Sequence, residues 1–247
     1  MRARAADMTD AERAIMTRAS QAREQGRRVV YIGFGSIMNQ RPKLIAELWE
    51  ALAYTDADPS DPGRVVLFYT GWTLPADAHG NDPSGWNREH CWPRSRGGFN
   101  TSPGVGTDLH MVRPTDVTVN TRRGNLAYDD GGELVVDNDG PTGCRRDADS
   151  WEPRDEVKGD VARALFYAAI RYEDADLDLE LIDYTTEQGD KRPLHGVLPT
   201  LIRWHEADPP DDFERRRNDR AEDLQGNRNP FVDRPEWVGR LWVESVR

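Results

Sequence analysis

The sequence predicts an α+β fold in which a loop-rich centre is followed by a mainly helical second half. Residues 70–150 hold few long periodic segments and many Gly, Pro, Asp and Asn residues, a composition typical of the loops on which functional sites sit. From residue 157 the pattern changes, and apolar residues recur at helical spacing. The chain has 247 residues, of which 37% are hydrophobic, and this suffices for a core in one domain. The helical positions are Val157, Val161, Ala164, Leu165, Ala168 and Tyr172.

The N-terminal part predicts one polar helix ahead of the main domain. Thr9 and Glu12 have the spacing of a capping box at the start of residues 8–26. We nevertheless expect residues 1–40 to be an extension of uncertain structure, with the folded domain at residues 41–247.

Further elements follow from periodicity and capping residues. Residues 43–54 place apolar side chains on one helical face, and residues 65–69 form a short β-type run. Proline residues mark helix starts and stops in the second half. The expected helices there are residues 199–207, residues 213–224 capped by Asp211, and a last one starting near Asp233 and Glu236.

The net charge of −11 does not favour a nucleic-acid partner, because phosphate contacts need local positive charge. Arginines nevertheless cluster in the central stretch, which can bind phosphates while acidic residues elsewhere set the total. We therefore expect salt-sensitive binding of nucleic acid. The clustered residues are Arg88, Arg94, Arg96, Arg113, Arg122 and Arg123.

Other composition features concern the compartment. No run approaches the ~18 apolar residues of a membrane span, so we expect no membrane partner. No apolar signal-peptide core follows the N-terminus, so we expect a cytoplasmic chain, another export route, or a leader that is missing from this version of the sequence. The two cysteines, Cys91 and Cys144, favour free thiols over a single disulfide bridge.

Two segments carry residues suited to phosphodiester hydrolysis, NREHCWP at 87–93 and VNTRRGN at 119–125. An attacking water must lose a proton, and histidine has a pKa suited to that task near neutral pH. Developing negative charge needs a hard cation, which prefers carboxylate, amide and water oxygens. Glu89, Asn120 and Asn125 offer such oxygens, whereas no Cys/His cluster has zinc spacing.

The expected local geometry is two extended segments followed by a short helix. If residues 86–92 are extended, Glu89 and His90 point to opposite faces, so one site can use both only at a strand end or a bend. Thr115 is a plausible N-cap and Gly124 a plausible C-terminal residue of a helix that carries Asn120.

These segments resemble the endonuclease I family of ββα-metal (His-Me finger) nucleases, and the branch of secreted bacterial ribonucleases and non-specific nucleases is closest. The resemblance covers roughly residues 45–242 in order. Further matching motifs are DLHMVRPTD (108–116), DSWEP (149–153), KGDVAR (158–163), RWHE (203–206), DDFERRRN (211–218) and QGNRNPF (225–231).

The resemblance implies a ββα-metal core and a secreted, largely sequence-non-specific endonuclease acting on DNA, RNA or both. His90 would be the general base, and Glu89 and Asn120 would bind Mg²⁺, with Ca²⁺ or Mn²⁺ as alternatives. Arg123 would hold the scissile phosphate or stabilise the transition state. The expected substrate contacts are Arg88, Arg94, Arg113 and Asn125.

Departures from the family pattern keep other functions open. Met111 stands where the family often has a second histidine, and Trp72 where it commonly has arginine. These features allow a nucleic-acid-binding protein that has lost catalysis. A phosphodiesterase for small substrates is a third hypothesis.

Several of these residues have a structural role as an alternative to the functional one. Glu89 could be a salt-bridge partner, Asn120 a cap and Asn125 a turn residue, while His110 could equally orient the site or be structural. For the remainder we favour packing at Cys91, Trp92 and His205, and solvent exposure at His79, His195 and Arg215 to Arg217.

Overall fold

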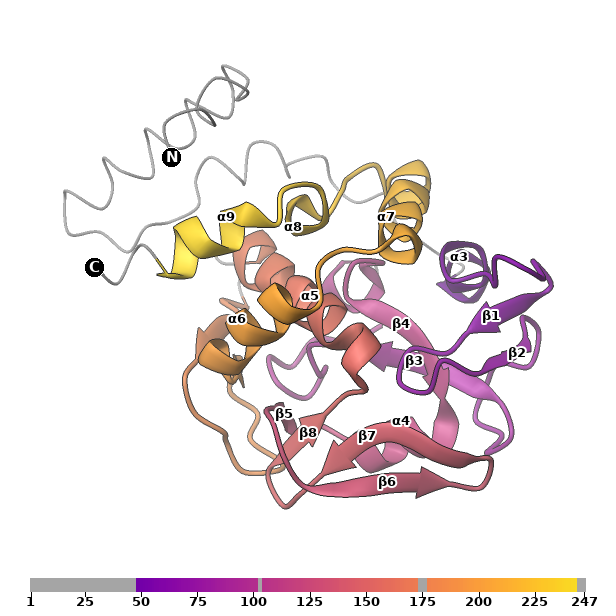
Figure 1. The fold of residues 1–247 in the computed structure, drawn as a ribbon, viewed down its shortest axis with the longest axis horizontal. Helices are drawn as coiled ribbons and strands as arrows, with labels where there is room; N and C mark the ends of the chain where they lie inside the picture. Colours follow the sequence, from indigo (N-terminus) through magenta and orange to yellow (C-terminus); the bar gives the residue numbers. More distant parts are fainter. Residues whose placement is uncertain (1–47, 102–103, 173–176, 244–247) are drawn as a thin grey trace.

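The computed structural model describes residues 48–101, 104–172 and 177–243, and the fold is mixed α+β with several small sheets (Figure 1). The α+β prediction is therefore confirmed. The predicted helix at residues 8–26 and the extension at 1–40 lie outside the described residues. Among the described residues, no helix combines the length and the apolar character that crossing a membrane requires.

The first described elements agree with the described part of the helix predicted at residues 43–54 and shorten the predicted strand. Residues 43–47 lie outside the described residues. Helix α3 (Leu48–Thr55) buries Leu48, Ala51 and Leu52. Strand β1 (Arg64–Val66) pairs antiparallel with β2 (Thr73–Pro75). The predicted run at 65–69 ends early because the chain turns there, with Gly71 N–H donating to Leu67 O at 2.8 Å.

A strand–strand–helix unit follows and confirms the expected local geometry. Strand β3 (Trp86–His90) pairs antiparallel with β4 (Val112–Asp116), and α4 (Val117–Arg123) follows directly. The N-cap is Asp116 rather than Thr115, since the Asp116 carboxylate accepts from Thr118 N at 2.8 Å and Val119 N at 3.1 Å. Thr115 instead lies in β4 opposite Asn87, and α4 ends at Gly124 as predicted.

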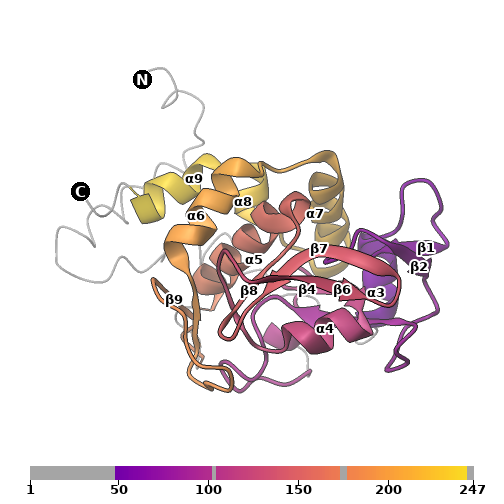
Figure 2. The same ribbon diagram turned by 60° about the horizontal axis from the view of Figure 1, so that its bottom comes forward.

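The region predicted as loops contains a four-stranded sheet with the order β5-β8-β7-β6. Its strands lack long apolar alternation, and β7 reads GPTGCRR, which explains why periodicity did not reveal it. The β6–β7 hairpin lies beside α4 in both views (Figures 1 and 2). The strands are β5 (Ala127–Tyr128), β6 (Glu133–Asp137), β7 (Gly140–Arg146) and β8 (Ser150–Glu152).

The second half is mainly helical, as predicted. Asp211 caps α7, with its carboxylate accepting from Glu214 N at 2.8 Å. Two short helices replace the single last helix that was predicted. Asn229 caps the first, and the second begins at Glu236. The helices are α5 (Lys158–Arg171), α6 (Leu198–Ala207), α7 (Asp212–Gln225), α8 (Pro230–Asp233) and α9 (Glu236–Val238), with strands β9 (Glu180–Ile182) and β10 (Leu194–Gly196) paired in parallel.

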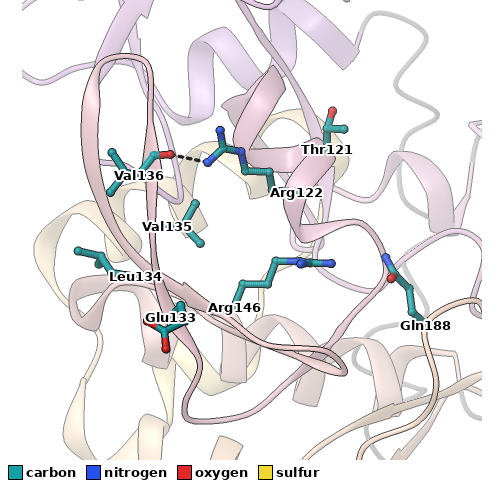
Figure 3. A pocket seen from close by; sticks show the side chains of 8 residues that line it. All are labelled: Thr121, Arg122, Glu133, Leu134, Val135, Val136, Arg146 and Gln188. Carbon is teal, nitrogen blue, oxygen red and sulfur yellow. Dashed lines mark hydrogen bonds between the residues drawn. The ribbon is translucent and has the colours of Figure 1, made fainter.

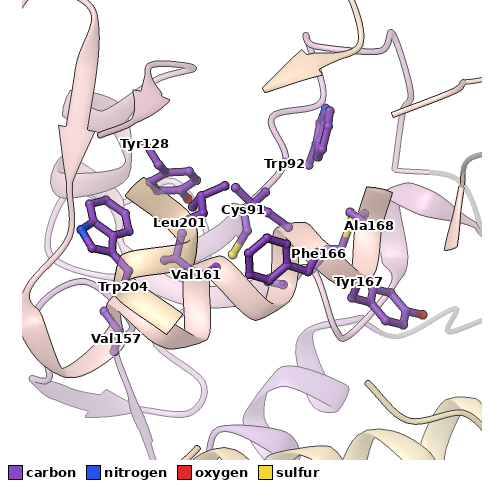
Figure 4. Packing of buried hydrophobic residues seen from close by; sticks show 14 of the residues in the cluster. Cys91, Trp92, Tyr128, Val157, Val161, Phe166, Tyr167, Ala168, Leu201 and Trp204 are labelled. Atoms are coloured by element: carbon purple, nitrogen blue, oxygen red, sulfur yellow. The ribbon is translucent and has the colours of Figure 1, made fainter. Parts of the chain in front are cut away.

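Helix α5 lies at the centre of the main hydrophobic core and is buried along most of its length. Apolar side chains from α6 and from the segment after β3 pack against it (Figure 4). Cys91 and Trp92 are fully buried there, and Cys91 and Cys144 are free thiols, which confirms the packing and free-thiol predictions. The segment after His90 is thus anchored in the core.

The prediction that Arg217 lies on the surface is wrong, because its side chain is buried in an ion pair. Its side chain is only 3% exposed, and its Nε donates to Asp56 Oδ1 at 2.9 Å. Arg113 also bonds to Asp56, at 3.1 Å, and to Asp160 at 3.3 Å. Some arginines of this negatively charged chain are therefore buried and have a structural role. Their carboxylate partners come from other segments of the fold.

The histidines divide into an exposed one and a buried group. His79 is exposed, as predicted, and His205 is buried, also as predicted. His195 is only 1% exposed, so the prediction of a solvated residue there is wrong. Its ring lies against Trp92 and Tyr128, a contact between distant segments that local turn residues do not reveal.

We expect three buried histidines to lower the free energy of unfolding as pH drops from about 6.5 toward 4. Burial lowers the pKa of His110 and His195, and burial together with Arg163 lowers the pKa of His205 to about 4. These side chains are neutral when folded but take up protons when unfolded, so stability is lost on acidification. Denaturant titrations at several pH values measure this slope. His205→Gln should remove on the order of 1–2 kcal/mol of the loss at pH 5 relative to the unchanged protein.

Candidate active site

His90 stands at the end of β3 and is 9% exposed. Its Nε2 lies 2.9 Å from Gly106 O, and since a carbonyl can only accept, Nε2 carries the proton. The other ring nitrogen, Nδ1, is then an acceptor. Burial, with smaller contributions from Arg94 and Arg88, lowers the pKa of His90 to about 4, which keeps the ring neutral near pH 7. A neutral, oriented imidazole is suited to accept a proton.

The carbonyl that orients His90 depends on a close backbone approach at Gly106. A Cβ at this position would lie 1.7 Å from Asn100 O, so only glycine fits there. Gly106 belongs to a short 3-10 turn at Val105–Thr107, in the loop between β3 and β4. The sequence analysis did not single it out, because nothing local links it to His90.

Glu89 lies on the opposite side of the strand from His90 and is 2% exposed. Its Oε1 accepts from Tyr69 Oη at 2.8 Å and from Tyr128 Oη at 3.4 Å, and Arg123 Nη1 lies 3.4 Å from the same oxygen. Burial raises the pKa of this carboxyl, and Arg123 and the two hydroxyls act against that shift. Every contact described for this carboxylate is made by Oε1.

Asn120 lies on α4 and contacts β3 directly. Its Nδ2 donates to Asn87 Oδ1 at 2.6 Å and to Arg88 O at 3.3 Å. That carbonyl belongs to the peptide that joins Arg88 to Glu89, so the amide of Asn120 lies within one peptide unit of the carboxylate-bearing residue. Both bonds use nitrogen, which leaves Oδ1 as the atom able to bind a cation.

Arg123 lies one turn further along α4 and is 1% exposed. Its Nη2 donates to Cys91 O at 3.0 Å and lies 3.3 Å from His195 Nε2, while its guanidinium stacks on the Tyr128 ring. The structure thus places Arg123 beneath Glu89, fastening α4 to β3 and to the core. Asn120 and Arg123 together hold one face of α4 against the strand.

Arg88 and Arg94 are the accessible cations beside His90. Both act electrostatically on His90, and burial, with a smaller contribution from Arg94, lowers the pKa of Arg88. Arg88 stacks on the Trp49 ring at 4.3 Å. Within the described ranges, neither arginine has an acidic partner. Two uncompensated cations next to a neutral imidazole suit an anionic ligand.

The other expected substrate contacts lie elsewhere. Arg113 belongs to the buried ion pairs with Asp56 and Asp160, which takes it out of the accessible surface. Asn125 bridges two loops, donating to Ser95 Oγ at 3.2 Å and accepting from Gly189 N at 3.3 Å. Its placement agrees with the turn alternative.

A family model described as Endonuclease I matches residues 35–236 of the 247-residue chain. The chain belongs to the endonuclease I family. It is 48% identical over 200 residues to a protein named extracellular ribonuclease from Bacillus subtilis (strain 168), covering 80% of this chain and 68% of that protein. A protein of the same name from Bacillus amyloliquefaciens matches equally. A protein named extracellular deoxyribonuclease from Aeromonas hydrophila is 27% identical over 204 residues, covering 78% of this chain and 75% of that protein.

Several endonuclease I motifs have a structural place in this chain. Asp108, fully buried, accepts from Tyr167 Oη and Tyr172 Oη at 2.7 Å each, and from Gln225 Nε2 at 2.9 Å. His110 Nε2 lies 2.9 Å from Asn227 O. This buried network joins the segment before β4 to α5 and the end of α7, which favours the structural alternative for His110.

The two departures of this endonuclease I member both pack in the interior. Met111 is fully buried in the main core, and Trp72 is partly buried against the smaller core around α3. Tyr69 and Tyr128, which hold the Glu89 carboxylate, were missed because their contacts join segments far apart in sequence.

Proposed function

We propose that this endonuclease I family protein is a metal-dependent, largely sequence-non-specific endonuclease that hydrolyses phosphodiester bonds of DNA, RNA or both. The observation that carries the proposal is the gathering of His90, Glu89 and Asn120 on one strand–strand–helix unit. We assign this unit, β3, β4 and α4, as a ββα-metal core. The printed names of the relatives, one ribonuclease pair and one deoxyribonuclease, support both polymers as substrates.

In this proposal His90 takes a proton from the attacking water. The hydrogen bond from Nε2 to Gly106 O fixes the tautomer, so Nδ1 is the basic nitrogen. The same bond can stabilise the imidazolium that forms, because a carbonyl oxygen accepts more strongly from a charged donor. His90 then needs no movement during the step.

The donor set fits a hard divalent cation such as Mg²⁺, with Ca²⁺ or Mn²⁺ as alternatives. Protein contacts occupy Oε1 of Glu89 and Nδ2 of Asn120, which leaves Oε2 and Oδ1 for metal coordination. Mg²⁺ is commonly held by one or two protein oxygens with waters completing its shell. When bound, the cation would stabilise negative charge developing on the phosphate. The described residues hold no cluster of three or more His, Cys, Asp or Glu side chains, so a site with more carboxylate ligands is not favoured.

Arg88 and Arg94 would hold the phosphate backbone beside His90. Their charges lack acidic partners in the described residues, whereas those of Arg113 and Arg123 are compensated inside the protein. We therefore propose that Arg88 and Arg94 make the substrate contacts. Arg113 and Arg123 do not. Arg123 acts as a positioning residue for Glu89. Secretion, as in the extracellular relatives, is part of the same proposal.

The test of the proposal is digestion of plasmid DNA and of RNA, side by side, with and without a chelator. We expect internal cleavage with added Mg²⁺ and none with excess chelator, restored by returning the metal. Binding of either polymer without cleavage at any metal concentration would favour the alternative of a catalytically weakened binding protein. Turnover of small phosphodiesters alone would favour a phosphodiesterase.

We expect Arg94→Gln to weaken substrate binding and its salt dependence. Each phosphate contact contributes about one unit to the slope of log affinity against log salt, so this slope should fall by about one unit. The apparent KM should rise about tenfold at low salt, with less effect on kcat. Arg145→Gln, which removes an exposed charge from β7, is the matched control. Equal effects of the two variants would contradict a specific role for Arg94.

A further inference from the structure

A hollow of about 610 Å³ lies between α4 and the β6–β7 hairpin. It is lined from the helix by Thr121 and Arg122, and from the hairpin by Arg146 and apolar residues of β6 (Figure 3). None of the site residues discussed above lines it. The full lining is Thr121, Arg122, Glu133, Leu134, Val135, Val136, Arg146 and Gln188.

Arg146 is the cation in this hollow that lacks a partner. Its Nε is buried and has no hydrogen-bond partner within the described residues, and no ion pair to it is found there. Figure 3 shows its side chain extending from β7 in the direction of Gln188. Arg122, by contrast, bonds to Asp137 at 3.3 Å and to Val136 O. Glu133 lies opposite Arg146 in the β6–β7 ladder and also lines the hollow, but no ion pair joins the two within the described residues. A half-buried arginine that is not held in an ion pair can bind an anion.

The same hollow offers apolar contacts. Leu134 and Val136 are 46% and 53% exposed, among the most exposed large apolar side chains described. Aliphatic side chains next to a free guanidinium suit a ligand that joins a flat apolar surface to a negative charge. An unstacked nucleotide has both, since its base presents an apolar face and its phosphate an anion.

The hollow is connected to the proposed catalytic centre by direct contacts. Thr121 and Arg122 follow Asn120 on α4. Gln188 also lines the hollow. Its side-chain nitrogen Nε2 lies against the end of that helix, at 3.3 Å from where a Cβ atom would be if Gly124 carried a side chain. The neighbouring Gly189 bonds to Asn125, and Asn125 bonds to Ser95, next to Arg94. These contacts link the segments that line the hollow to the segment that carries Arg94.

We propose that this hollow is a subsite for a nucleotide of the single-stranded polynucleotide substrate that flanks the scissile bond. Arg146 binds its phosphate, and Leu134 and Val136 contact its base. This inference rests on the proposed nuclease function and adds to it an assigned binding position outside the β3–β4–α4 unit. A substrate that extends to the hollow gains this contact, whereas one too short to reach it does not.

The test compares Arg146→Gln with Arg145→Gln, the same change at the adjacent residue of β7. Arg145 does not line the hollow, and its Nη1 donates to Gly132 O at 3.3 Å. Single-stranded oligonucleotides on the order of 4 and 16 nucleotides long serve as substrates. We expect Arg146→Gln to raise KM about tenfold for the long substrate and less than about twofold for the short one. Arg145→Gln should change neither by more than about twofold.

Binding without cleavage separates this inference from the proposed function. Anisotropy of the labelled long oligonucleotide, measured in excess chelator, should show weaker binding by Arg146→Gln than by Arg145→Gln. Equal behaviour of the two variants in both assays would overturn the subsite, whatever the wild-type activity. Equal effects of Arg146→Gln on long and short substrates would also overturn it, since a subsite acts only on chains that reach it. A wild-type protein that cleaves neither substrate would overturn the nuclease proposal instead.

Discussion

His90→Ala is expected to lower kcat by about 10²–10⁴-fold with little change in KM. The side chain is held by a hydrogen bond from Nε2 to Gly106 O, and its ring is neutral near pH 7 and is influenced electrostatically by Arg88 and Arg94. Removing it leaves the cations that bind phosphate in place, so affinity should persist. Single-turnover cleavage of a labelled oligonucleotide, together with a separate binding measurement, checks both parts.

Added imidazole gives the matched control for this variant, because the truncated side chain leaves space where a free base can bind. Partial recovery of cleavage in proportion to imidazole would identify the lost group as a proton acceptor. Thermal unfolding should show that the variant remains folded. Wild-type rates in folded His90→Ala would remove the proposed mechanism.

Asn120→Ala and Glu89→Gln are expected to raise the Mg²⁺ concentration needed for half-maximal cleavage by tenfold or more and to reduce kcat by about 10²-fold. Each removes one of the two oxygens assigned to the metal. Metal binding in the absence of nucleic acid, measured by calorimetry, should weaken in parallel. That readout distinguishes loss of a ligand from loss of substrate affinity.

The two variants should differ in their free energy of unfolding, and this difference separates a loss of metal binding from a loss of stability. Glu89→Gln removes the charge partner of the buried Arg123, and breaking such a pair destabilises by about 3–5 kcal/mol. Asn120→Ala leaves that ion pair intact, so it should be the more stable of the two variants. Tyr69→Phe is the control, because it removes a donor to Oε1 and keeps the oxygen assigned to the metal. An unchanged metal requirement in folded Asn120→Ala would contradict the proposed ligand set.

Local sequence patterns accounted for the elements whose stabilisation is local. The periodicity from Val157 predicted α5, and Asp211 predicted the start of α7, because helix faces and caps are set by residues three or four apart. The same reasoning located an extended segment with His90 and a short helix with Asn120. The four-stranded sheet was missed, since β7 pairs through its backbone with strands that share no apolar alternation.

The sequence motifs did not predict which arginine side chains are exposed to solvent. Of the central cluster, Arg96, Arg113 and Arg123 are buried, whereas Arg88 and Arg94 remain accessible in part or in full. A guanidinium has the same charge wherever it lies. Its role is decided by carboxylates and carbonyls from other segments, which a local pattern does not place.

By itself the sequence determined the order of the main helices, the strand that ends in His90 and the helix that carries Asn120, because spacing and capping act within a few residues. Only the tertiary structure decided that Gly106 would orient His90, that Arg123 would be enclosed under Glu89 and that Arg146 would face an open hollow. These outcomes depend on contacts between segments far apart in the chain. The free energy of each buried charge or hydrogen bond is set by the partners and the solvent exclusion that folding brings to it.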